Sequence, residues 1–231
     1  MDRGEDRIIA QSEVALSKPI YHIYLLSRLV FADATDWQKI LKELSQGRKN
    51  MFWSYKPLRN GAFRMASQKD RDSKAIYHQV SELAKRAGGE RCQRANLGSL
   101  STFEKKFLPQ IQKARNSYME PGLKPIDFGE IRLAGGPHFS VLDRHGDEKF
   151  VYLHPSANWD DRETEAFCEL LTAVVENRHN ASARDVWFLD LRRGIKIPWN
   201  SSKKRVREKC KRAAAFLVTL KNANAITDDS E

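Results

Sequence analysis

The sequence predicts a mixed α+β protein with a helical first half and a second half that contains strands. In residues 1–120, apolar side chains recur every three or four positions, which is the spacing of a helix with one buried face. After residue 125 the apolar segments become short and alternate with polar residues, which is typical of strands. Apolar residues make up 41% of the 231 residues and aromatic residues 10%, enough to form a hydrophobic core.

Start and stop signals bound each helix of the first half. Asp36 is placed to cap the second helix and Ser101 the fifth, because short side-chain oxygens accept the free N–H groups of a first turn. Pro57 and Gly61 predict a kink or break in the third helix. The predicted helices cover residues 20–30, 36–47, 51–66, 70 or 72 to 88, and 101–114.

Pro121, Gly122 and Pro125 interrupt the helical spacing and predict a domain boundary. The expected order after them is β-β-β-α-β-(β)-α, in which the first three strands form an antiparallel hairpin or meander. The chain is thereby divided into a helical domain, a mixed α/β domain and a flexible polar tail, at residues 1–120, 126–221 and 222–231. The expected strands are 128–133, 138–142, 149–154, 185–192 and 195–197, and the helices are 162–176 and a last one opening at 201 or 202.

Positive charge is concentrated near the end of the chain. The sequence has 40 Lys and Arg against 30 Asp and Glu, a formal net charge of +10. Residues 191–221 alone hold 11 basic residues and 1 acidic residue, so this segment also carries +10. A localised positive charge favours a polyanionic partner. We therefore expect nucleic acid to bind here, mainly through its phosphate backbone and with weak sequence specificity.

Cations occupy the first turn of the last predicted helix, where the helix dipole already places positive charge. A phosphate bound at Ser201, Ser202 and the free N–H groups would remove this conflict. A solvated lysine-rich helix is the alternative interpretation. The residues predicted to contact nucleic acid are Arg192, Arg193, Lys196, Ser201, Ser202, Lys203, Lys204, Arg205, Arg207 and Lys211.

A second stretch, residues 48–64, interleaves basic and aromatic side chains. Aromatic rings and cations together are the chemistry with which proteins hold single strands. The same spacing is also that of an ordinary buried helix face, which is the interpretation we favour, with the cations as an additional phosphate-facing surface.

The order of strands and helices in residues 126–220 resembles the core of the PD-(D/E)XK, restriction-endonuclease-like superfamily. In that family an Asp on one hairpin strand and a Glu-x-Lys on the next bind magnesium and orient water. Glu130, Asp143, Glu148 and Lys149 lie in the corresponding part of this sequence. Glu148 and Lys149 are adjacent, so they point to opposite faces of a strand and cannot share one site. The resemblance therefore implies a degenerate, non-cleaving member or a relocated site, and residues 143–148 are more simply a polar hairpin turn.

Asp190 lies inside an otherwise apolar strand and shares a face with Phe188 and Arg192. It is either paired with Arg192 or a buried catalytic acid. Under a nuclease hypothesis the catalytic residues are Glu130, Asp143, Lys149 and Asp190, with Mg²⁺ as cofactor. Otherwise we expect no cofactor, because no two histidines have the i, i+4 spacing of a helical metal site.

The remaining features place the protein in a cytoplasmic, bacterial-type setting. No apolar run reaches the roughly 20 residues that span a bilayer, and residues 1–7 lack the order of a secretory signal. Cys92, Cys168 and Cys210 are widely spaced, which predicts free thiols. Three functions remain open: nucleic-acid binding, metal-dependent nuclease activity, and an assembly role in which the basic helix meets an acidic protein surface or a second copy of the chain.

Overall fold

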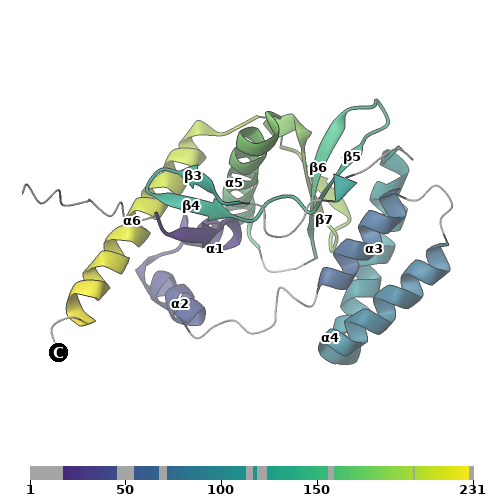
Figure 1. The fold of residues 1–231 in the computed structure, drawn as a ribbon, viewed down its shortest axis with the longest axis horizontal. Helices are drawn as coiled ribbons and strands as arrows, with labels where there is room; N and C mark the ends of the chain where they lie inside the picture. Colours follow the sequence, from purple (N-terminus) through teal and green to yellow (C-terminus); the bar gives the residue numbers. More distant parts are fainter. Residues whose placement is uncertain are drawn as a thin grey trace, which may run out of the picture.

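The computed structural model describes residues 18–45, 55–67, 72–112, 117–118, 124–155, 159–199 and 201–228. It confirms the mixed α+β class: the first half of the described chain is mainly helical, and most of the strands lie in the second half together with two long helices. In the part of the chain described, the strands form two sheets, one of five strands and one of three. Helices cover both faces of the five-stranded sheet (Figure 1).

The five-stranded sheet has the order β2-β5-β6-β7-β8. Its central strands are β5 (Phe139–Leu142), β6 (Glu148–His154) and β7 (Val186–Asp190), flanked by β2 (Ser117–Tyr118) and β8 (Ile195–Ile197). β5 and β6 form the predicted hairpin, whereas β6 and β7 are parallel, with His154 opposite Asp190 in the register. A parallel pair needs a crossover, and α5 (Asp161–His179) provides it.

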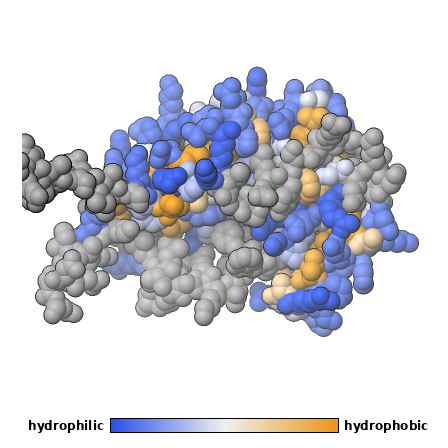
Figure 2. Space-filling view, in the orientation of Figure 1, coloured by the Kyte–Doolittle hydropathy of each residue, from blue (hydrophilic) through white to orange (hydrophobic). Residues whose placement is uncertain are grey.

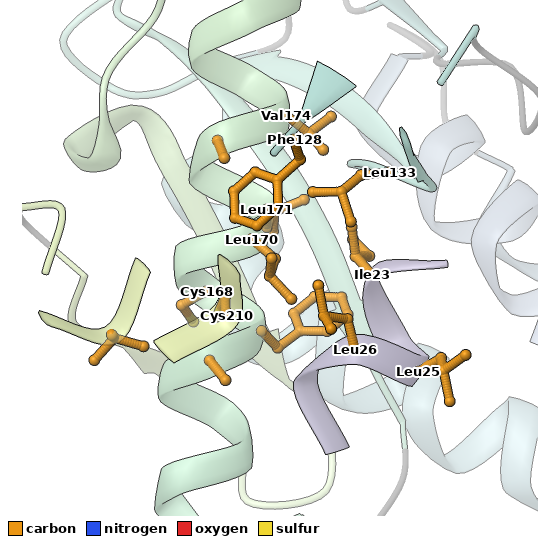
Figure 3. Packing of buried hydrophobic residues seen from close by; sticks show 14 of the residues in the cluster. Ile23, Leu25, Leu26, Phe128, Leu133, Cys168, Leu170, Leu171, Val174 and Cys210 are labelled. Atoms are coloured by element: carbon orange, nitrogen blue, oxygen red, sulfur yellow. The ribbon is translucent and has the colours of Figure 1, made fainter. Parts of the chain in front are cut away.

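One face of this sheet packs against α5, α1 (Ile23–Leu29) and α6 (Lys204–Asp228). Alternate strand residues such as Phe150, Tyr152 and Phe188 point into this core, as the two-residue period of a strand requires. Figure 3 shows Leu26 of α1 directed toward Leu170 and Leu171 of α5, and Cys210 of α6 beside Cys168. The first part of the chain therefore shares a core with the last helix.

The opposite face packs against α3 (Lys56–Ser67) and α4 (Ser73–Thr102). The strand residues that alternate with those of the first core point into this second core; they include Val151, Leu153 and Leu189. Gly61 lets α3 approach α4 closely, because a Cβ atom added there would lie 2.5 Å from Cγ2 of Val80. The sheet thus separates two cores, and both draw on elements before and after residue 121. The division at residues 1–120 and 126–221 stays a prediction.

The second sheet corrects one strand prediction and one helix prediction. The expected strand 128–133 is a hairpin of β3 (Ile126–Phe128) and β4 (Ile131–Ala134), joined at Gly129, which has a φ of 59°. A residue without a Cβ adopts this left-handed conformation at little cost, so the chain reverses there. The segment expected to be one helix, 20–30, begins as β1 (Ile20–His22), which pairs in parallel with β4. A continuous meander over 126–154 was therefore the wrong prediction, since its hairpins lie in different sheets.

Several helix ends also differ from the prediction. Helix α2 (Ala34–Ser45) is capped by Asp33, whose Oδ1 accepts the Asp36 N–H, so Asp36 lies in the first turn. Asp72 caps α4 as one of the two expected residues. Gly88 and Gly89 interrupt α4 with non-helical dihedrals, but helix resumes at once and Ser101 lies inside it. Residues 46–54, which include the start of the predicted third helix, lie outside the described residues.

Helix α6 continues to Asp228, beyond residue 222 where we expected a frayed tail; Ala223 and Ala225 in this segment favour the helical conformation. Its buried stripe of Val206, Cys210, Ala213 and Leu217 matches the predicted one. Of the helices described, none combines the length and the apolar character needed to cross a membrane.

Candidate functional site

A polar pocket lies where β6 and β7 end. His154 is the last residue of β6 and Asp190 the last of β7, and because the strands are parallel these two side chains meet at one edge of the sheet. The first turn of the crossover helix α5 adds Thr164. In open α/β sheets ligands bind outside the carboxyl ends of parallel strands, and the one parallel pair described in this sheet, β6 and β7, places the pocket at such a position.

The pocket has a volume of about 320 Å³. Trp159 forms an aromatic wall, with its ring 4.3 Å from that of His154 and packed against Phe167 and Phe188. The β7–β8 turn contributes Arg192 and Arg193. The lining is completed by Ile197, so that His154, Trp159, Thr164, Phe188, Asp190, Arg192, Arg193 and Ile197 surround the space.

Asp190 is held by the turn that follows it. Its Oδ1 accepts hydrogen bonds from the backbone N–H groups of Arg192 and Arg193, at 3.0 and 2.9 Å. Its Oδ2 lies 3.6 Å from Nε of Arg193. We predicted that Asp190 pairs with Arg192. Asp190 does bind Arg192, but through its backbone N–H. The arginine side chain shown beside the carboxylate is that of Arg193. The carboxylate thus fixes the position of both arginines.

His154 is buried, with 5% of its surface exposed, and its Nε2 has no hydrogen-bond partner within the described protein. Burial lowers the pKa of His154 from 6.5 to about 4, although Asp190 favours the charged form and Arg193 opposes it. The imidazole is therefore neutral at pH 7. Its unpartnered nitrogen leaves a buried polar atom unsatisfied at the wall of the pocket, which costs free energy unless a ligand or water supplies a partner.

The lowered pKa of His154 predicts a pH dependence of stability. Since the folded pKa lies near 4 and the unfolded one near 6.5, the unfolded chain binds more protons between these values. The free energy of unfolding should therefore rise with pH from about 4 to 6.5. Replacing His154 with Phe should make this slope shallower by up to about 1.4 kcal/mol per pH unit, measured by denaturant unfolding across the window. An unchanged slope would refute the assignment.

The predicted phosphate site at the start of α6 is occupied by one of the protein's own carboxylates. Glu169 of α5 is fully buried, and its Oε2 accepts the backbone N–H of Lys203 at 2.7 Å. Its Oε1 accepts the Ser202 hydroxyl at 2.7 Å and Nε of Arg207 at 2.6 Å. The dipole conflict is thus resolved within the molecule, and a phosphate at Ser201 and Ser202 would have to displace Glu169. No sequence pattern indicates that Glu169, 33 positions before Ser202, reaches this turn.

The other cations of α6 divide into paired and unpaired groups. Lys203 lies 2.5 Å from Glu165, Arg207 also contacts Glu176 at 2.9 Å, and Lys211 contacts Glu208 at 2.9 Å. Lys204 and Arg205 are exposed and make no such contact with any part of the chain that the structure describes. The predicted cluster is therefore not one uniform phosphate-binding face.

A cation from the first half of the chain joins the β7–β8 turn. A Cβ atom added at Gly194 would lie 3.6 Å from Cγ of Lys106, which follows α4 in the π-helical turn Phe103–Phe107. On β8, Lys196 extends over Trp187, with Nζ 4.4 Å from the ring centroid. No local sequence pattern indicates a role for Lys106, because only the packing of α4 on the sheet brings it there.

The four nuclease candidates are not brought together. Glu130 lies in the β3–β4 turn of the other sheet. Lys149 lies five residues before His154 on β6, so roughly 16 Å separates it from the end of the sheet that holds Asp190. Asp143 accepts backbone N–H groups of its own turn from His145 and Asp147, as expected for a polar hairpin turn.

Lys149 belongs to a structural ion pair. Its Nζ contacts Asp185 at 3.1 Å and Asp147 at 3.8 Å. Asp185 also accepts the hydroxyl and N–H of Ser182. Burial alone would raise the pKa of Asp185, but these bonds and Lys149 lower it. Among the residues described, no group of three or more His, Cys, Asp or Glu side chains is placed to hold a metal ion.

The basic and aromatic stretch 48–64 contributes mainly to packing where it is described. Phe63 packs against the core formed by α3, α4 and the sheet, with its ring 5.9 Å from that of Phe139. Tyr55 packs against the same core. Residues 48–54, which include Arg48, Lys49, Phe52 and Trp53, lie outside the described residues, so their part of the prediction stays open.

No family model matches the chain, and no curated protein matches it closely enough to indicate a relationship.

Proposed function

We propose that this protein binds nucleic acid through the phosphate backbone. The contact region, here called the basic surface, consists of Lys106, Arg192, Arg193, Lys196, Lys204 and Arg205. The observation that carries the proposal is the proximity of Lys106 to Gly194 in the β7–β8 turn, because it brings cations from distant parts of the sequence near each other. Cations spaced along one surface can follow a run of phosphates.

The β7–β8 turn and the start of α6 both contact the same face of α5. Arg193 lies 4.0 Å from Asp161, and Lys203 lies 2.5 Å from Glu165. Asp161 and Glu165 are four residues apart, so they are neighbours on the same side of the helix. The β7–β8 turn and the first turn of α6 therefore flank the same edge of α5, and Lys204 and Arg205 extend the row of cations.

The acids on this edge do not oppose the proposal. Asp161 is 98% exposed and Glu165 41%, and such exposed ion pairs contribute only about 0–1 kcal/mol. Phosphates can therefore replace these carboxylates as partners of Arg193 and Lys203 at little cost. The buried pairs of Glu169 remain in place, which positions the two turns relative to each other. Figure 2 shows that most of the described surface on the face in view is hydrophilic, with smaller apolar areas between.

The test compares a charged backbone with a neutral one. We expect the protein to bind a fluorescently labelled 20-nucleotide DNA in an anisotropy titration. A peptide nucleic acid of the same base sequence carries no phosphates, so it should bind at least about a hundredfold more weakly. Equal affinity for the two backbones would overturn the proposal, and so would the absence of binding to DNA and RNA, single-stranded and duplex, at low salt.

A further inference from the structure

The pocket at the ends of β6 and β7 opens beside the basic surface and shares Arg192 and Arg193 with it. A backbone-binding surface alone does not account for a cavity of about 320 Å³, since phosphates in a strand can be bound on an open surface. The stability of the fold does not explain the pocket either, because the buried Nε2 of His154 lacks a hydrogen-bond partner there. The pocket is therefore the best-supported candidate for a second, small-ligand site.

The charges of the pocket favour an anion. Arg192 and Arg193 contribute two positive charges and Asp190 one negative charge, while His154 is neutral. Asp190 is already bonded to two backbone N–H groups, so its charge is largely compensated by the turn. Asp161, 4.0 Å from Arg193, is 98% exposed and screened by water. At the N-terminus of α5 the carboxylates of Asp160, Asp161 and Glu163 offset the helix dipole, so the positive charge of the pocket comes from the two arginines.

The shape and lining favour a nucleotide over a bare ion. The pocket is larger than a phosphate ion needs, which leaves room for a ring system beside Trp159 and Phe188. Trp159, which packs against His154, Phe167 and Phe188, borders the space as an apolar wall, and paired arginines hold phosphates by charge-assisted hydrogen bonds. The free nitrogen of His154 is then available to hydrogen bond with the ligand.

We infer that this pocket binds a single phosphorylated nucleotide, either free in solution or as the phosphorylated end of a strand held by the basic surface. Arg192 and Arg193 bind the phosphate, Trp159 borders the base, and Nε2 of His154 makes a buried hydrogen bond with the ligand. The second form rests on the proposed function, because only a bound strand would present its end here. The first form does not depend on it.

Calorimetric titration with thymidine 5′-monophosphate, and with unphosphorylated thymidine, tests the pocket directly. The monophosphate should bind and thymidine should bind at least about tenfold more weakly, since it lacks the charge-assisted bonds. Arg192→Gln/Arg193→Gln and His154→Phe should each weaken monophosphate binding about tenfold or more. The matched control, Lys196→Gln/Lys204→Gln, removes the same charge outside the pocket and should leave this affinity within about twofold. Equal binding of the two ligands, or no binding of the monophosphate, would overturn the inference.

Two further measurements separate the possible failures. His154→Phe changes a buried side chain, so circular dichroism must show a native spectrum, and the exposed arginine pair gives an independent result if it does not. A DNA strand with a 5′-phosphate should bind more tightly than the same strand without it if the pocket holds strand ends. Binding of the monophosphate without this preference identifies a free nucleotide as the ligand. Tight binding of long DNA without any monophosphate binding would refute the pocket and leave the proposed function standing.

Discussion

Replacing Glu169 with Ala should lower the free energy of unfolding by about 3 kcal/mol or more. Glu169 is fully buried on α5 and accepts bonds from Ser202, Lys203 and Arg207, which together hold the first turn of α6 against α5. Removing one partner of a buried pair costs about 3–5 kcal/mol, because the other charge is left uncompensated. Arg207 keeps Glu176 as a second partner at 2.9 Å, so the lower end of this range is expected.

Urea unfolding followed by circular dichroism measures this effect. Glu169→Gln keeps an oxygen acceptor but loses the charge, so it should be intermediate. Glu165→Ala is the matched control, since Glu165 also contacts the start of α6 but is 41% exposed, and it should cost no more than about 1 kcal/mol. If Glu169→Ala and Glu165→Ala were equally mild, the account of how α6 is positioned would be wrong.

Neutralising the unpaired part of the basic surface should weaken nucleic-acid binding by about a hundredfold or more. The variant carries Lys106→Gln, Lys196→Gln, Lys204→Gln and Arg205→Gln, and it spares every buried ion pair described above. At about 0.1 M salt, each counterion released by a phosphate contact contributes roughly tenfold to the affinity. Two productive contacts among the four would therefore produce the expected loss, measured by anisotropy with labelled DNA.

A matched variant removes four charges elsewhere. Lys85, Arg86, Arg91 and Arg94 are exposed around the kink of α4 at Gly88 and Gly89, and each is replaced by Gln. Its net charge equals that of the first variant, so a general charge effect would weaken both alike. We expect the control to lose less than about fivefold. Equal losses would show that attraction is not localised at the basic surface.

Local chemistry made much of the fold predictable from the sequence. The helix expected at 162–176, observed as Asp161–His179, follows from its stripe of apolar residues, and in the structure Asp160 caps it. The hairpin of β5 and β6 follows from two alternating segments around a polar turn. Such features depend on neighbours in the sequence, and they are confirmed with small shifts of their ends.

Features that depend on distant residues were not predictable. Residues 20–22 were predicted to begin a helix, but they pair in parallel with β4 and therefore form strand β1. In the same way, the fifth helix was expected to open at Ser101, yet the chain is already helical after Gly89 because it packs against α3 and the sheet. Long-range packing overrides local propensity in both cases.

The candidate site shows the same division. The sequence identified Asp190 as an unusual acid and residues 191–205 as basic, because charge and strand pattern are local. It did not identify His154 as part of a site with Asp190. Its position beside Asp190 depends on the parallel pairing of β6 and β7, which no short motif reveals. Nor did charge counting reveal that Glu169 would occupy the expected phosphate site.

The salt dependence of DNA binding tests the central proposal most directly. The logarithm of the association constant should fall linearly with the logarithm of the salt concentration, with a slope of about −3 or steeper, since each phosphate contact on duplex DNA contributes roughly −0.9. The four-cation variant should give a clearly shallower line. A slope near zero for the unmodified protein would contradict binding through the phosphate backbone.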